Sequence, residues 1–166
     1  MTLCDYFSAA DDRTAVAVLQ TPGGPGQAEV DVVFLKSIDP VVAVAQLEAT
    51  VTGCGYEEAG ERRRSGQLLS EPEDGPPFVV SLSDTLTDAL ATATRDDLVR
   101  FAGPWCMTDG LRQTGISVED TAAVLEALGG LAQRAQASDR RLYCWWALGL
   151  TVADEARRVA RQPVRH

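Results

Sequence analysis

Very few residues of this 166-residue chain could carry acid–base or nucleophilic chemistry. The single histidine is the last residue, His166, and chain ends are usually poorly ordered, so mechanisms that pair serine or cysteine with histidine are disfavoured. The same shortage disfavours zinc and iron sites, which depend on imidazole. The cysteines lie far apart and form no C-x-x-C pair: Cys4, Cys54, Cys106 and Cys144. We therefore expect reduced thiols, no metal site and no cofactor.

Five residues remain as candidates for a pocket of aromatic and carboxylate groups: Asp5, Tyr6, Lys36, Asp39 and Trp105. Lys36 is the only lysine, and an amine shielded from water could form a Schiff base with a carbonyl compound. Its commoner role at a strand end is solvation, or pairing with Asp39. Trp105 follows a predicted helix end in "GPWCMTDG", where a large apolar side chain either fills the core or lines a groove. The core role is favoured for Trp105.

The elements that must position these residues alternate between strand and helix. Strands are expected at about residues 2–7 and 78–82 and in the β-branched run "EVDVVFLKS". Polar side chains that suit helix N-caps precede each expected helix: Ser8, Asp39, Ser83, Thr94 and Ser117. This order of segments favours an α/β architecture.

Glycine and proline set the expected boundaries of these elements. The helix that begins after Ser8 should reach about residue 19 and end at "TPGGPG", a stretch that lacks the Gly-Lys-Ser/Thr of a phosphate-binding loop. The helix after Thr94 should stop at Gly103-Pro104. Residues 56–77 should form a surface loop, alone or with one short helix. The pair Gly129-Gly130 inside the last helix indicates close packing.

The stretch "LYCWWAL", residues 142–148, is a continuous apolar run with three aromatic side chains. A buried strand would place Trp145 and Trp146 on opposite faces of a sheet, one under the long helix and one against a second layer. Helical spacing fits the same residues and would join them to the C-terminal segment. We favour the strand, and we expect the aromatic cluster to be core unless one tryptophan lies near Tyr6 and Trp105.

Together these segments predict one α/β domain over residues 1–150, with a small mixed sheet of three to four strands packed with four to five helices. Residues 151–166 are rich in arginine and should form a helix or tail that could serve docking or self-association. The N-terminus lacks a basic start and a long apolar run, and no stretch of the chain is apolar enough to span a membrane. We therefore expect a cytoplasmic protein without membrane contact.

Charge is distributed unevenly along the chain. The net charge is −9, but residues 1–133 carry −13 and the remainder carries +4. An acidic body repels phosphate backbones, which argues against nucleic acid as a partner. It attracts basic proteins over long distances.

Three segments of the chain together carry a family resemblance. They are the N-terminal "M-x-x-x-x-Y-F" followed by a capped helix, the helix end "LEATVTG" and the strand-helix-helix run "VVSLSDTLTDALATATRDDLVRFAG". These segments resemble the YfbM-like family of bacterial proteins. So does a long helix followed by an apolar strand. The likeness covers most of residues 3–148, but the region around "FLKSIDPVVAVAQLEA" lacks the tryptophan and histidine expected there. It implies an α/β fold with a small mixed sheet and suggests an immunity-like role, without a catalytic activity.

Two functions remain open at this point. The first is a non-enzymatic binding or interaction module whose acidic surface engages a basic protein. The second is a small enzyme or ligand binder that works without histidine, through a pocket of aromatic and carboxylate groups. Convergence of Tyr6, Lys36 and Trp105 in a cleft would favour the second function.

Overall fold

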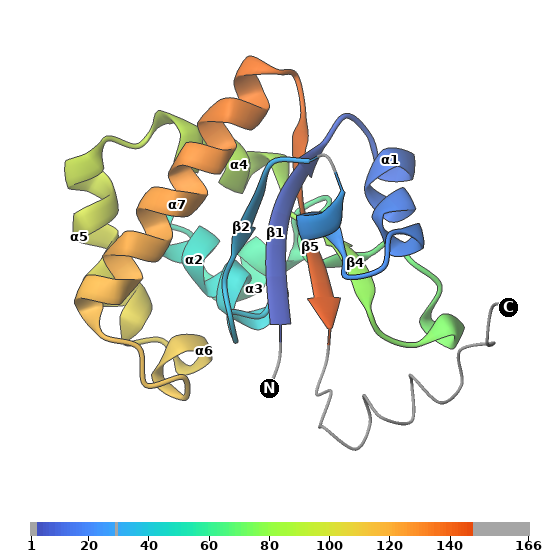
Figure 1. The fold of residues 1–166 in the computed structure, drawn as a ribbon. Helices are drawn as coiled ribbons and strands as arrows, with labels where there is room; N and C mark the ends of the chain where they lie inside the picture. Colours follow the sequence, from blue (N-terminus) through green and yellow to red (C-terminus); the bar gives the residue numbers. More distant parts are fainter. Residues whose placement is uncertain (1–2, 29, 148–166) are drawn as a thin grey trace, which may run out of the picture.

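The computed structural model describes residues 3–28 and 30–147, and its centre is an antiparallel sheet with strand order β2-β1-β5-β4-β3 (Figure 1). The strands are β1 (Leu3–Ala9), β2 (Val32–Phe34), β3 (Gln67–Leu68), β4 (Phe78–Ser81) and β5 (Arg141–Ala147). The α/β class is confirmed. The expected sheet was too small and of the wrong type, because the described part has five strands and each neighbouring pair is antiparallel.

The connection between β4 and β5 explains why a mixed sheet is the wrong expectation. Alternating strands and helices favour parallel crossovers through a single helix. Here four helices lie between the two strands and return the chain to the end at which β4 stops. Ser81 pairs with Tyr143 there, and the backbone N–H of Leu82 donates to the carbonyl of Leu142 at 3.1 Å. β3 could not be predicted from the sequence, because its two residues are too few to show the alternating pattern of a strand.

Seven α-helices occur in the described residues, more than the four to five expected, because three of them have six residues or fewer. They are α1 (Asp12–Val16), α2 (Val42–Thr52), α3 (Tyr56–Glu61), α4 (Asp84–Thr92), α5 (Arg95–Cys106), α6 (Asp109–Arg112) and α7 (Val118–Ala137). Short 3-10 turns add η1 (Ala17–Gln20), η2 (Pro25–Gln27) and η3 (Pro72–Asp74). α3 confirms the short helix expected in residues 56–77.

Three of the expected N-caps are confirmed by hydrogen bonds. The side chains of Ser83, Thr94 and Ser117 each accept the backbone N–H three residues later, at 3.0 to 3.1 Å. Ser8 is not a cap, because it belongs to β1 and pairs with Leu142. Asp11 caps α1 instead, accepting the N–H of Thr14 at 2.8 Å.

The helix after Thr94 does not stop at Gly103-Pro104 but continues to Cys106. Proline lacks one backbone donor, yet a proline close to a helix end forfeits little further pairing. Trp105 holds this last turn in the core: it is fully buried, and its indole N–H donates to the carbonyl of Ala43 at 2.9 Å. The packing expected at Gly129 is confirmed, since a Cβ atom there would lie 3.0 Å from Leu98.

Two layers cover the faces of the sheet. α2, α4 and α7 lie on one face, with α5 packed against α7, while α1 and the turn η2 lie on the other (Figure 1). Side chains of β1 alternate accordingly: Cys4 and Tyr6 enter the larger core, and Phe7 and Ala9 enter the smaller one. The strand that carries "LYCWWAL" is confirmed as β5 through Ala147, with Trp145 in the smaller core and Trp146 against the larger one.

The arginine-rich segment expected at residues 151–166 lies outside the described residues. Among the helices of the described part, none combines the length and the apolar character needed to cross a membrane.

Candidate functional site

Three of the five residues expected to form a pocket meet instead at the first turn of α2. The hydroxyl of Tyr6 donates to the carbonyl of Ile38 at 2.5 Å, and burial raises the pKa of this hydroxyl well above its usual value. The carboxylate of Asp39 accepts three successive backbone N–H groups at 2.5 to 3.2 Å. Trp105 reaches the carbonyl of Ala43 in the same turn. Because Tyr6 and Trp105 are fully buried, this cluster anchors a helix and offers no access to a ligand.

The other two residues lie apart from that cluster. Lys36 is exposed between β2 and α2 and forms no ion pair with a described residue. Asp5 is on the face of the sheet opposite to Tyr6, because neighbouring residues of a strand point in opposite directions. The structure therefore does not bring the five residues into one pocket.

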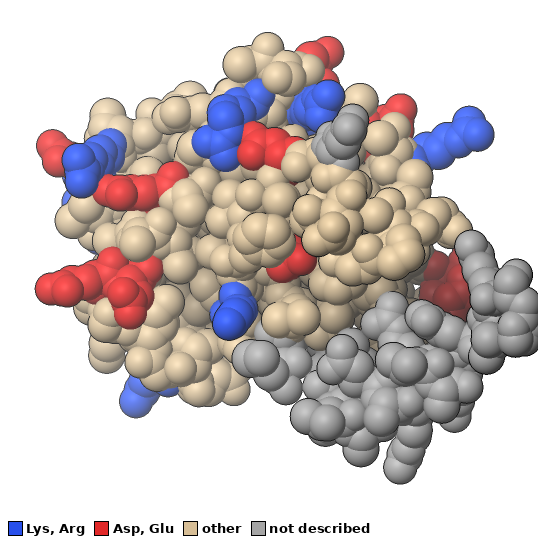
Figure 2. All heavy atoms as spheres, in the orientation of Figure 1, with Lys and Arg blue, Asp and Glu red and all other residues tan. Residues whose placement is uncertain are grey.

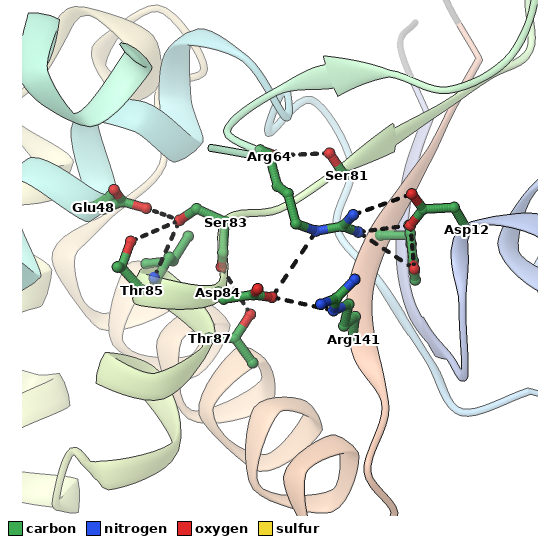
Figure 3. Close-up of polar contacts among 11 residues, drawn as sticks. Asp12, Glu48, Arg64, Ser81, Ser83, Asp84, Thr85, Thr87 and Arg141 are labelled. Atoms are coloured by element: carbon green, nitrogen blue, oxygen red, sulfur yellow. Dashed lines mark hydrogen bonds and ion pairs between the residues drawn. The ribbon is translucent and has the colours of Figure 1, made fainter. Parts of the chain in front are cut away.

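A network of polar groups, buried on one side and reaching the surface on the other, was not foreseen from the sequence (Figure 3). The guanidinium of Arg64 donates to both oxygens of Asp12, at 2.7 and 3.1 Å, and the hydroxyl of Tyr143 donates to the same carboxylate at 2.7 Å. The Nε atom of Arg64 is buried and has no hydrogen bond with a described residue. It lies 3.9 Å from the carboxylate of Asp84, and the same carboxylate lies 3.5 Å from Arg141. These contacts tie the turn before β3 to α1, α4 and β5.

The second half of the network centres on Glu48, which is 1% exposed in α2. Its carboxylate accepts the hydroxyl of Ser83 and one guanidinium N–H of Arg62, the latter at 3.0 Å. A serine at a strand-to-helix junction could act as a nucleophile, with a neighbouring buried carboxylate as its general base. Here Ser83 is itself buried and also accepts the N–H of Leu86, so the hydroxyl is enclosed and serves as a cap. The arrangement joins α2 to α4 and is not open to a substrate.

One signal in the sequence could have revealed Glu48. The apolar face of α2 runs through residues 44, 47 and 51, and position 48 lies on the same face four residues after Val44. A carboxylate on an apolar face needs a partner once buried. The partner, Arg62, could not be identified, because it lies directly after α3 in a polar segment with several arginines.

An open groove lies between α2 and the segment that joins α5 to α6. Its volume is about 440 Å³, and its walls are formed by Gln46, Ala49, Thr50, Cys54, Tyr56, Met107, Thr108 and Asp109. Tyr56 and Met107 are exposed, the latter by 66%, so apolar surface faces solvent here. Cys54 is the one cysteine that is not buried. The groove therefore offers a thiol, a phenol and a carboxylate close together.

Cys54 is expected to react with a thiol reagent in the folded protein roughly 100-fold faster than the other three cysteines, which must await opening of the core. Titration with 5,5′-dithiobis(2-nitrobenzoate) should release one equivalent rapidly and the remainder after denaturation. Cys54→Ser should abolish the rapid phase only. A second thiol reacting at the rate of the first would contradict the burial of the others.

Asp5 occupies a different kind of position, between two aromatic side chains. It pairs with Phe34 of β2 and with Trp145 of β5, so the three side chains form a row on one face of the sheet. Asp5 is 9% exposed, and its carboxylate has no hydrogen bond or ion pair with any described residue. Burial without a partner raises the pKa of this carboxyl to about 6.

No family model matches this chain, and no curated protein or solved structure was found to be similar to it. Within residues 3–28 and 30–147, no group of three or more histidine, cysteine, aspartate or glutamate side chains could hold a metal ion. The geometry of the described residues is therefore the basis for the function proposed below.

Proposed function

We propose that the protein is a cytoplasmic, non-enzymatic interaction module, immunity-like in kind, whose acidic surface binds a basic protein. The observation behind this proposal is the balance of charges left after internal pairing. The described residues include 21 acids and 11 bases, and six of each are joined in ion pairs. Fifteen acids and five bases have no ion pair with another described residue. Most of this surplus is at the surface, where it attracts cationic proteins.

Long-range attraction of this kind acts mainly on the rate of association. It does not require the acids to share one site, because potentials from separate charges add over roughly a Debye length, about 8 Å at physiological salt. The exposed acidic pairs at the starts of α3 and α7, Glu57-Glu58 and Glu119-Asp120, contribute to this potential. Exposed Arg13 and Arg112 oppose it.

The test is to isolate partners from the native cell and to measure association with each purified partner. We expect a basic partner whose association rate falls about tenfold between about 50 and 300 mM salt. Replacing Glu57 and Glu58 by glutamine should slow association. Replacing Arg13 and Arg112 by glutamine should accelerate it, because the protein becomes more acidic. Association rates that ignore both salt and these opposite charge changes would refute the proposal.

A second candidate function is suggested by the groove beside α2. Its walls combine the phenol of Tyr56 with the carboxylate of Asp109, the pairing of aromatic and acidic groups expected of a small-ligand binder or a histidine-independent enzyme. A screen of small molecules for protection of the Cys54 thiol would test this alternative. Protection that is lost in Tyr56→Ala and retained in Phe34→Ala would favour it, whereas failure of every compound would count against it.

A further inference from the structure

We propose that Asp5 is a recognition site for one ammonium or guanidinium group, supplied by a lysine or arginine side chain of the basic partner. The source of the cation rests on the proposed function, but the site itself rests on four features of the smaller core face. They are the row of side chains formed by Phe34, Asp5 and Trp145, the turn η2 that crosses this row, the carboxylate of Asp5 without a partner among the described residues, and the exposed ring of Phe34.

The row places a carboxylate between two aromatic side chains on adjacent strands. Residues directly opposite each other in antiparallel strands have Cβ atoms about 5 Å apart, so Phe34 and Trp145 both adjoin Asp5. A cation held by a carboxylate in this position also meets aromatic faces, and such faces attract cations within about 6 Å. Carboxylate and aromatic groups together form a favourable environment for ammonium or guanidinium.

The turn η2 spans the row as a strap. Gly24, at φ 81°, lies so close to Trp145 that a Cβ atom would be 2.7 Å from the indole, and a Cβ on Gly26 would be 3.0 Å from the ring of Phe34. The strap therefore touches the aromatic side chains on both sides of Asp5. The backbone hydrogen bonds within residues 21–28 are local, such as those from Gly24 to Thr21 and from Gln27 to Gly24, both at 3.1 Å. Contacts with the two rings hold it in place.

The carboxylate of Asp5 is unusual among the buried charges of this protein. Glu48 and Arg64 are also buried, at 1% and 7% exposure, yet each has an ion pair and hydrogen bonds. Asp5 has neither with the described residues, although burying an unpaired charge is costly. A polar group kept in this state has an unused capacity for a strong, charge-assisted bond to an incoming cation.

Phe34 provides the approach to this carboxylate. Phe34 is 63% exposed, whereas Trp145 on the other side of Asp5 is only 7% exposed, so the side of Phe34 is the more accessible one. In the view of Figure 2, one acidic group and one basic group lie near the middle of the molecule, with uncharged surface around them. A partner that docks here would cover apolar surface and place one basic side chain against Phe34 and Asp5.

The experiment uses the full chain and three small probes: Nα-acetylarginine amide, Nα-acetyllysine amide and Nα-acetylcitrulline amide. Citrulline keeps the shape of arginine but lacks its charge. At about pH 7.5, where a carboxyl of pKa about 6 is ionised, ¹H–¹⁵N spectra should show saturable shifts at Asp5, Phe34 and the Trp145 indole with the two cations. Asp5→Asn should weaken these shifts at least about tenfold, and Asp96→Asn, an exposed acid of α5, should leave them unchanged.

Equal shifts with citrulline, or cation shifts that persist in Asp5→Asn, would overturn the assignment. The outcome for the proposed function is separate. A basic partner that binds Asp5→Asn as tightly as the natural chain, with its salt dependence intact, would refute the role of Asp5 and leave the acidic interaction module standing. Arginine binding at Asp5 without any salt-sensitive basic partner would refute the module and keep the cation site.

Discussion

Arg64→Met is expected to lower the free energy of unfolding by about 2 kcal/mol, because it removes a guanidinium whose side chain is only 9% exposed, together with its two hydrogen bonds to the carboxylate of Asp12, which is 44% exposed. Arg64 donates two hydrogen bonds to Asp12 and lies 5.7 Å above the ring of Tyr143, and the hydroxyl of Ser81 donates to its carbonyl. Methionine retains part of the apolar stem but leaves Asp12 and Tyr143 without their cation. Urea unfolding monitored by tryptophan fluorescence would measure the loss.

Arg141→Met is the matched control for this substitution. Arg141 also faces Asp84, but about half of its side chain is exposed, so the pair is screened by water. We expect a loss below about 1 kcal/mol. Equal losses for the two variants would show that burial adds nothing to the Arg64 contacts.

The acid limb of the stability curve provides a second measurement for Arg64→Met. Hydrogen bonds from Arg64, followed by those from Tyr143, lower the pKa of Asp12 in the folded protein. A lowered folded pKa contributes stability above the unfolded value, and that contribution disappears as the pH falls through the folded value. Arg64→Met should therefore lose less stability than the natural chain on acidification. An unchanged acid limb would contradict the role given to Asp12.

The parts of the fold that sequence could predict are those set by local chemistry. Ser83, Thr94 and Ser117 are caps because a hydroxyl accepts an N–H within its own turn. The start of α1 is different, since Ser8 and Asp11 are both suitable caps and strand pairing decides between them. The end of α5 depends on the burial of Trp105 against α2, and this tertiary contact cannot be predicted from the residues next to Trp105 in the sequence.

The candidate site was only partly predictable for the same reason. Asp5 and Tyr6 could be singled out as an acid and an aromatic in a strand, but which face each occupies depends on the register of β1 against β5. Arg64 and Asp12 are 52 residues apart, and nothing in either neighbourhood of the sequence indicates the other. The electrostatic roles of these residues follow from topology, which periodicity alone does not supply.

Asp5→Asn is expected to raise the free energy of unfolding by about 1 to 2 kcal/mol near neutral pH, less than the full pKa difference would give, because the carboxylate oxygens keep some contact with solvent. The folded pKa of about 6 exceeds the ordinary value of 3.8, and each pKa unit corresponds to about 1.4 kcal/mol. Asparagine has nearly the same shape and carries no charge, so the penalty of burying an ion disappears. Chemical denaturation of both proteins at several pH values would measure the gain.

The pH dependence separates this effect from general changes in packing. Because the folded pKa of Asp5 is raised, the folded state holds the proton more tightly than the unfolded state between about pH 4 and 6. The natural chain should therefore lose stability as the pH rises through this window, and Asp5→Asn should not. The two proteins should have nearly equal stability below about pH 4, where both side chains are neutral.

Asp109→Asn, an exposed acid of α6, should change stability by less than about 0.5 kcal/mol at any of these pH values. A gain for Asp5→Asn that is independent of pH would mean that shape, and not charge, makes the difference. Since the same substitution should weaken cation binding, its two effects have opposite signs. Replacing a residue that has a purely structural role would lower the free energy of unfolding. A carboxylate that serves a ligand instead destabilises the free protein until the cation binds, so its replacement raises that free energy.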